Sequence, residues 1–245
     1  HATAYALLAY RTAFMKAHYP LEFLCGLMSC DAGDSDKLHT FIQDAQGKGI
    51  EVLPPDVNRS QVGFGVEGEA IRFALSAVKG VGENAAASIV AARERMGGPF
   101  QDLVHLCEEV DLGACNRAAL EALIKAGACD ALAASRAEAL AELEGAHRAG
   151  QQTQEDRRRG QGSLFGACEP GPGGNGSGGA AARRERQVWT EAEKLAHEKQ
   201  ALGFYLTGHP LQRKGPFFRK LAGLSVEELL AAPPESIAPD RVVGL

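Results

Sequence analysis

The sequence of 245 residues has no apolar run of about 18 residues, the length that a membrane-spanning helix needs, so no transmembrane span is expected. It also lacks an excess of positive charge: 26 Lys and Arg stand against 31 Asp and Glu, for a net charge of −5. That balance argues against a protein that holds nucleic acid by bulk positive charge. No initiator Met, signal peptide or transit peptide precedes His1, so we expect an internal piece of a longer protein.

Cysteine pairs with metal-ligand spacing are also missing. The sequence has no Cys-x-x-Cys, and its 7 His show no spacing typical of metal ligands. The cysteines are scattered: Cys25, Cys30, Cys107, Cys115, Cys129 and Cys168. We expect reduced, packed thiols in a cytoplasmic protein rather than a disulfide framework or a zinc site.

Patterns that would indicate catalysis are absent as well. No paired acidic residues follow adjacent predicted strands, as a two-metal phosphoryl-transfer site would need. No phosphate-binding loop and no nucleophile with a partnering His and acid is present. The sequence therefore predicts no catalytic residue, no metal site and no cofactor within this chain.

What is present is mainly helical periodicity, so we expect a mainly α chain. Apolar residues at helical spacing predict an amphipathic helix over 4–17, with Thr3 as a possible cap and Pro20 beyond its end. Further helices are expected over Glu22–Cys30, Asp36–Gln46, much of Ser76–Leu143 and about 190–206, where Thr190 and Glu193 form a capping box. The Glu and Arg mixture of 136–159 predicts a solvated helix face that ends in a basic tract.

Three other segments break this helical pattern. Alternation in Val62–Glu67 and Ala70–Phe73, around Gly68, predicts a small β-hairpin. Residues 166–182 are rich in Gly, Pro, Ser and Asn, and predict a flexible linker because they offer little apolar area to bury. Asp240–Leu245 reads as a strand that is cut off at its start.

The sharpest local motif is Lys79-Gly80-Val81-Gly82, between an expected helix over Phe73–Lys79 and a second helix from Glu83. It resembles the helix-hairpin-helix module of DNA-binding proteins. Two glycines would bring main-chain N–H groups close to a phosphate, and the helix start after them favours an anion. Val81 would point inward, and Lys79 would pair with phosphate. An ordinary tight interhelical turn is the alternative, and Glu83 counts against a phosphate at that helix start.

Ala86 and Ile89 support the motif because their spacing would pack the second helix on the first. A second hairpin is suggested by Asn116–Lys125, the turn 126–128 and Asp130–Leu143, but it has a single glycine. We expect it to complete a tandem unit by packing rather than to form a second strong phosphate site.

A short peptide, Gln161-Gly162-Ser163-Leu164-Phe165, follows a run of three arginines. It resembles the peptide by which bacterial replication proteins hold the sliding clamp. Leu164 and Phe165 would fill an apolar pocket, while Gln161 and Ser163 would supply polar contacts. A chance Leu-Phe pair is the alternative reading of so short a motif.

Several stretches together resemble bacterial DNA polymerase III alpha subunits, the C-family replicative polymerases, in that family's order. They are His1–Ala13 with Lys16–Phe23, Gly49–Asn58, Val78–Glu83, Leu120–Asp130 and Glu198–Leu211. The resemblance implies that residues 1–50 are the end of the fingers and that 51–150 form a tandem helix-hairpin-helix DNA-binding domain. Residues 151–188 would hold the clamp peptide and the linker, 189–238 would be a helical connector, and 239–245 would start an OB domain.

The same resemblance implies the function. The parent enzyme would be a DNA-directed DNA polymerase that uses Mg²⁺ on palm carboxylates, which this chain lacks, so the piece should be inactive alone. Its expected partners are primer-template duplex, the sliding clamp and other replicase subunits in the bacterial cytoplasm at the nucleoid, with no membrane. His1, Thr3, Tyr5 and Arg11 would lie near the incoming nucleotide, without an assigned role. The alternative is a non-enzymatic helix-hairpin-helix repair or structural module.

Overall fold

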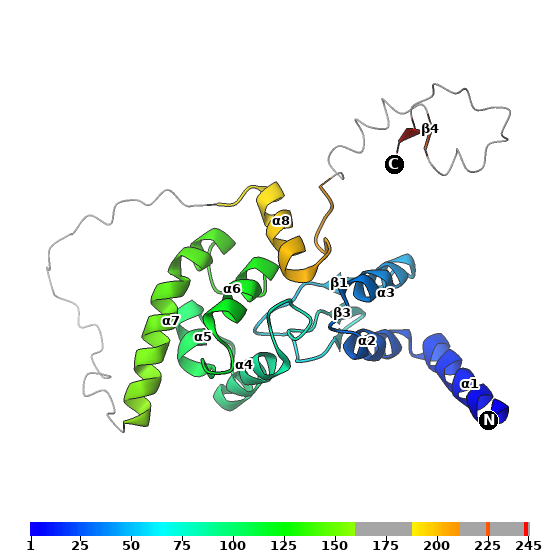
Figure 1. Cartoon of the computed structure of the whole chain (residues 1–245), viewed down its shortest axis with the longest axis horizontal. Helices are drawn as coiled ribbons and strands as arrows, with labels where there is room; N and C mark the ends of the chain where they lie inside the picture. The colour runs from blue at the N-terminus through cyan, green and yellow to red at the C-terminus, as the bar shows by residue number, and fades with distance from the viewer. Residues whose placement is uncertain (160–187, 211–223, 226–242, 245) are drawn as a thin grey trace, which may run out of the picture. The chain divides into compact units, whose positions relative to one another are not determined.

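The computed structural model describes residues 1–159, 188–210, 224–225 and 243–244 (Figure 1). The chain divides into two compact units, His1–Leu206 and Thr207–Leu245. The described elements are mostly helices, so the prediction of a mainly α chain is confirmed. No described helix is both long and apolar enough to cross a membrane.

The chain begins with three helices: α1 (Ala2–His18), α2 (Pro20–Cys30) and α3 (Ser35–Gly47). Pro20 occupies the first turn of α2, where its missing N–H costs no hydrogen bond, so the chain breaks between α1 and α2 as predicted. The expected Thr3 cap is wrong: His1 is the N-cap of α1, and its side chain makes no capping bond. All α1 residues are exposed, so its apolar stripe is not buried, although the end of the helix lies beside α2.

A small sheet follows, with strand order β1-β3-β2. The predicted hairpin is confirmed, although shorter than expected: β2 (Gly65–Glu67) pairs antiparallel with β3 (Ala70–Arg72), and Gly68 turns between them with φ +64°. The parallel strand β1 (Val52–Leu53) was not predicted, because two residues are too few to show alternation.

The loop after β1 ties distant segments together. The Val57 N–H donates to the carbonyl of Ala128 (2.9 Å). The Asn58 amide both accepts from the Phe100 N–H (2.7 Å) and donates to its carbonyl (3.1 Å). The buried Ser60 hydroxyl donates to the carbonyl of Phe73 (2.7 Å). These bonds hold the sheet against the helices that follow.

Four helices come next, with their neighbours shown in Figure 1: α4 (Glu83–Met96), α5 (Leu103–Glu109), α6 (Arg117–Ala126) and α7 (Arg136–Arg158). The predicted break at 126–128 is confirmed by Gly127, which ends α6 in the left-handed conformation. The expected helix from Asp130 is wrong in its start. The chain turns through 128–134, and Ser135 then caps α7 by accepting the Glu138 N–H.

The long helix α7 is more buried than its composition suggested. It packs closely on α5, and Leu143, Ala146 and Gly150 are buried. The Gln154 amide donates to carbonyls at the end of α5, those of Cys107 (3.0 Å) and Val110 (2.7 Å). The expected solvated face over 136–159 is confirmed, since most of its Glu and Arg residues are exposed, while the opposite side of α7 satisfies the last carbonyls of α5.

Helix α8 (Glu191–Leu202) opens with the predicted capping box of Thr190 and Glu193. It ends earlier than the predicted 206, because Gly203 takes a left-handed φ of +95°. In the second unit, β4 (Leu224–Ser225) pairs in parallel with β5 (Val243–Gly244). The rest of the expected OB start at 239–245 and the linker at 166–182 lie outside the described residues, and the domain boundaries drawn from the resemblance stay predictions.

Among the described cysteines none forms a disulfide. Cys25, Cys107, Cys115 and Cys129 are buried, whereas Cys30 is exposed. Burial raises the pKa of the Cys107 and Cys115 thiols to about 12. This part of the chain agrees with the expectation of reduced, packed thiols.

Candidate nucleic-acid interface

The segment before the glycine hairpin is not the helix that we predicted. Between Phe73 and Lys79 the chain makes consecutive turns, with Val78 N–H donating to the carbonyl of Leu75 (3.2 Å). The Leu75 and Ser76 N–H groups instead bond to the carbonyls of Gln61 and Val62. Because these donors are used by another loop, a helical ladder cannot form here. The segment is core, and it fixes the position of the hairpin.

The hairpin residues take the roles that their types suggested. Gly80 has φ +84°, a left-handed conformation that favours glycine, and it faces Ala122 of α6. Val81 is buried, as predicted, and its N–H donates to the carbonyl of Val78 (2.9 Å). Gly82 is the N-cap of α4 and has no neighbour where a Cβ would stand. Gly80 therefore allows the turn, and Gly82 leaves open space beside the start of α4.

The start of α4 is open to solvent. Its N-cap is a glycine, so no side chain bonds to the first-turn N–H groups from that position. Glu83 is exposed in this first turn. Ala86 and Ile89 are buried in the hydrophobic core, as their spacing predicted, although no first helix precedes the hairpin.

Two hollows flank the hairpin, and Lys79 and Gly80 line both of them. One has a volume of about 440 Å³ and is bounded by the turn between α2 and α3, by Gly82 and by Leu202. The other, of about 360 Å³, lies towards α6 and α8. In the second hollow Lys125 pairs with Glu121 at 2.8 Å. No such carboxylate partner of Lys79 occurs among the residues that the structure describes.

The turn at Gly127, by contrast, is covered. Gly127 has φ +87°, and the Arg136 guanidinium lies where its Cβ would be. Arg136 is held there by Asp130, with both nitrogen–oxygen distances at 2.8 Å. The turn of the second hairpin is therefore closed by Arg136. This agrees with the expectation that it contributes packing rather than a second strong phosphate site.

A contact that sequence reasoning missed joins the hairpin to α8. The Lys79 N–H donates to the carbonyl of Ala201 (2.8 Å), and the Lys79 ammonium lies beside Gly203. The two residues are more than a hundred positions apart, so no local pattern could reveal the contact. A glycine directly after a helix was the one available signal.

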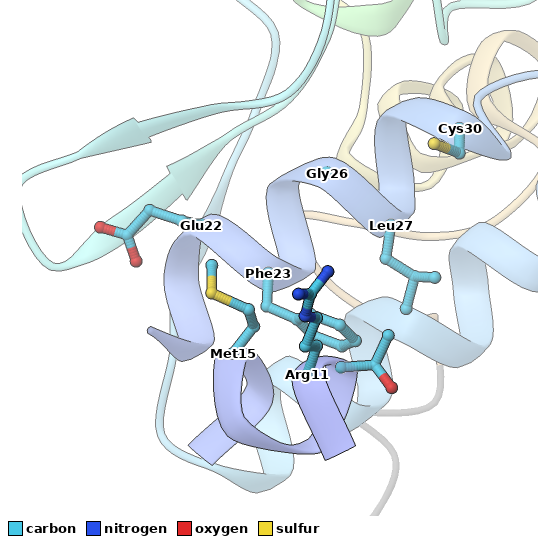
Figure 2. A pocket seen from close by; sticks show the side chains of 8 residues that line it. Arg11, Met15, Glu22, Phe23, Gly26, Leu27 and Cys30 are labelled. Atoms are coloured by element: carbon cyan, nitrogen blue, oxygen red, sulfur yellow. The ribbon is translucent and has the colours of Figure 1, made fainter. Parts of the chain in front are cut away.

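A third hollow, of about 380 Å³, lies between α1 and α2 (Figure 2). It is bounded mostly by apolar side chains, and Figure 2 shows Met15 and Arg11 of α1 facing Phe23 and Leu27 of α2 across it. Of the residues that the resemblance placed near a nucleotide, only Arg11 borders it; Thr3 and Tyr5 are exposed on α1, and His1 is exposed at its N-cap.

The remaining predicted site lies outside the described residues: Gln161, Ser163, Leu164 and Phe165. Within the described part of the chain, no group of three or more His, Cys, Asp or Glu side chains could hold a metal ion.

Comparison with known proteins identifies relatives for this architecture. The helix-hairpin-helix motif family matches residues 49–139, which include the Lys79–Gly82 hairpin. DNA polymerase III subunit alpha of Thermus aquaticus is 46% identical over 229 residues, which is 94% of this chain and 18% of that protein. The Caulobacter vibrioides subunit is 38% identical over 245 residues, 100% of this chain and 21% of that protein.

A third relative, DNA polymerase III subunit alpha of Neisseria meningitidis serogroup A, is 40% identical over 240 residues, which is 96% of this chain and 20% of that protein. The chain thus spans about a fifth of the length of the curated relatives it matches. The resemblance seen in the sequence is confirmed: this chain contains a helix-hairpin-helix motif and is related over nearly its whole length to DNA polymerase III alpha subunits.

Proposed function

We propose that this chain binds duplex DNA through the Lys79–Gly82 hairpin and the start of α4, and does so as part of a replicative DNA polymerase III alpha subunit. Main-chain N–H groups would hold a backbone phosphate, with Lys79 as its cation, and no base would be read. The net charge of −5 offers no bulk attraction. Binding by the chain alone should therefore be weak and salt-sensitive, at about 10⁻⁴–10⁻⁶ M.

One observation carries this proposal: Gly82 opens α4 without a side-chain capping bond, and nothing lies within 4 Å of its Cβ position. Beside it, Lys79 is exposed and borders both hollows. A helix start that is open, next to an exposed lysine, is an arrangement that favours an anion.

The test is duplex affinity measured against salt. Gly80→Ala with Gly82→Ala should weaken binding, but Gly80 has φ +84°, so the double variant also strains the turn. Gly82→Ala alone is cleaner, because its backbone (φ −71°, ψ 162°) accepts alanine. We expect it to lower affinity about tenfold at low salt, since a methyl group would stand where the phosphate approaches. Gly145→Ala, at an open helical position, is the matched control. Unchanged binding by both hairpin variants would contradict the phosphate grip.

We further propose that Gln161, Ser163, Leu164 and Phe165 hold the sliding clamp. Leu164→Ala with Phe165→Ala should abolish capture by immobilised clamp, because the two side chains supply the apolar anchors. The control is Val188→Ala, an exposed apolar residue outside the peptide. Retained capture by the double variant would exclude this role.

The catalytic step belongs, on this proposal, to parts of the parent enzyme outside this chain, where palm carboxylates would hold Mg²⁺. The chain alone should then show no nucleotide incorporation in a primer-extension assay with Mg²⁺ present. Measurable incorporation would contradict that assignment.

The non-enzymatic helix-hairpin-helix module remains the second candidate, and a coding sequence upstream of His1 without a palm domain would favour it. The cellular setting proposed is the bacterial cytoplasm at the nucleoid, with other replicase subunits as partners.

A further inference from the structure

The end of α8 is fixed within the first unit by several independent contacts. Leu202 and Phe204 are buried, and the Phe204 ring lies between His39 of α3 (5.6 Å between centroids) and Phe73 (6.2 Å). The buried Glu198 carboxylate accepts the Leu206 N–H at 2.6 Å. The last turn of α8 is therefore a rigid part of this unit rather than a loose connector.

Lys79 meets this rigid end twice. Its N–H donates to the carbonyl of Ala201 (2.8 Å), which fixes the backbone of the hairpin's first residue. A Cβ on Gly203 would lie 2.7 Å from the Lys79 Nζ and 2.8 Å from the Ser35 Cβ. Gly203 also has φ +95°. The left-handed backbone at position 203 therefore favours glycine, and the Lys79 ammonium lies in the space that a side chain there would fill.

The electrostatics of the contact suit a cation. The C-terminal end of a helix carries partial negative charge on its unpaired carbonyl groups, and an ammonium beside it is stabilised. A lysine side chain normally occupies many rotamers, and ordering it opposes binding. A lysine already held near one place loses less entropy when a phosphate arrives.

We propose that the C-terminal turn of α8 orients Lys79 for the phosphate, with Gly203 as a positioning residue. This inference rests on the proposed function of the hairpin. It makes the segment after the predicted linker part of the DNA grip, although it lies more than a hundred residues from the hairpin. Gly203 acts through Lys79, so its substitution should matter only while Lys79 is present.

A double-mutant cycle on the 245-residue chain tests this. Lys79→Met should lower duplex affinity about tenfold at low salt. It should also reduce by about one the slope of the logarithm of the binding constant against the logarithm of the salt concentration. Gly203→Ala should lower affinity about threefold to tenfold and reduce the same slope, because the methyl group displaces the ammonium. In the Lys79→Met background Gly203→Ala should cause no further loss.

Two controls separate positioning from damage to the fold. Gly97→Ala introduces alanine at a left-handed C-cap (φ +67°) with nothing within 4 Å, so it reproduces the backbone strain alone, and the Lys79→Met background accounts for the contact of the new methyl group with Ser35. Gly203→Asn gives a second variant at the site itself, since Asn tolerates the left-handed region better than Ala. Trp189, the single tryptophan, stacks at 4.1 Å on His197 of α8 itself, so its fluorescence reports whether this segment keeps its local structure, and thermal unfolding of each variant reports whether the whole fold is kept.

The outcomes are distinct. If the Gly203 variants lose the same DNA affinity in the wild-type and in the Lys79→Met background, the positioning role is overturned. Unchanged affinity of Gly203→Ala and Gly203→Asn in the wild-type background would overturn it as well. An unaltered affinity for Lys79→Met, with a loss for Gly82→Ala, would overturn it while leaving the hairpin as a DNA site. Unchanged binding by Lys79→Met and Gly82→Ala together would overturn the proposed function itself.

Discussion

The guanidinium of Arg136 lies directly over Gly127, and this contact distinguishes the turn at Gly127 from the Lys79–Gly82 hairpin. Arg136 is drawn there by two hydrogen bonds to Asp130, both 2.8 Å, and its side chain is only 11% exposed. Gly80 and Gly82 have no such cover. A phosphate could therefore approach the first turn but not the second.

Replacing Gly127 should destabilise the fold without changing DNA binding. Gly127→Ala would strain a left-handed residue and push Arg136 from Asp130, which together should cost about 2–4 kcal/mol. Urea denaturation measures that loss. The duplex affinity of the folded protein should equal that of the wild type, and a weakened affinity would show that the second turn also holds DNA.

Two glycines of α7 should respond in opposite ways to alanine. A Cβ on Gly150 would collide with the backbone carbonyl of Cys107 in α5, so Gly150→Ala should cost about 1–3 kcal/mol through overpacking. Gly145 has open space around it, and Gly145→Ala should stabilise the helix by about 0.5–1 kcal/mol. Thermal unfolding of the pair makes each variant the control for the other. Equal shifts would contradict the close approach of α5 and α7.

The ion pairs of Glu109 should make stability fall in acid. The pKa of Glu109 lies below its ordinary value of 4.5, first because Arg157 donates a hydrogen bond to it and also because Arg95 does. A carboxyl with a lowered pKa stabilises the fold above its ordinary value, and this contribution disappears as the pH falls through the lowered pKa.

We therefore expect Glu109→Gln to be about 1 kcal/mol less stable than wild type near neutral pH, because both arginine partners are largely exposed. The difference should shrink steadily once the pH drops below about 4.5. Denaturation curves over that range measure it, and a gap that does not change with pH would contradict the assignment to Glu109.

The described cysteines should differ in reactivity. Burial raises the pKa of Cys25 to about 11 and that of Cys107 and Cys115 to about 12. Burial also raises the pKa of Cys129. The thiolate is the reactive form, so alkylation of the native chain near pH 8 should modify the exposed Cys30 well before these four. Mass spectrometry of quenched samples separates the sites, and urea should remove the difference. Early modification of Cys107 would contradict its burial.

Local signals were read correctly where the physics is local. Pro20 marks the boundary between α1 and α2, Gly68 forms the turn of the hairpin, and Thr190 with Glu193 caps α8. Each of these effects depends on a few neighbouring residues. The same holds for Val81, whose apolar side chain between two glycines points inward.

Predictions failed where distant groups compete for backbone bonds. The segment from Phe73 to Lys79 has helical spacing, but its N–H groups bond to the loop at Gln61 and Val62. The stretch after Gly127 also has helical periodicity, yet the chain turns there until Ser135 caps α7. Propensity is a weak bias, and tertiary hydrogen bonds override it.

The sequence by itself determined the mainly α composition, the glycine hairpin at Lys79–Gly82 and the relationship to DNA polymerase III alpha subunits, since these depend on residue types and their order. Only the tertiary structure decided which glycine turn stays open and what holds Lys79. Arg136 reaches Gly127 and α8 reaches Lys79 through folding of the chain, which brings together residues that no spacing rule connects.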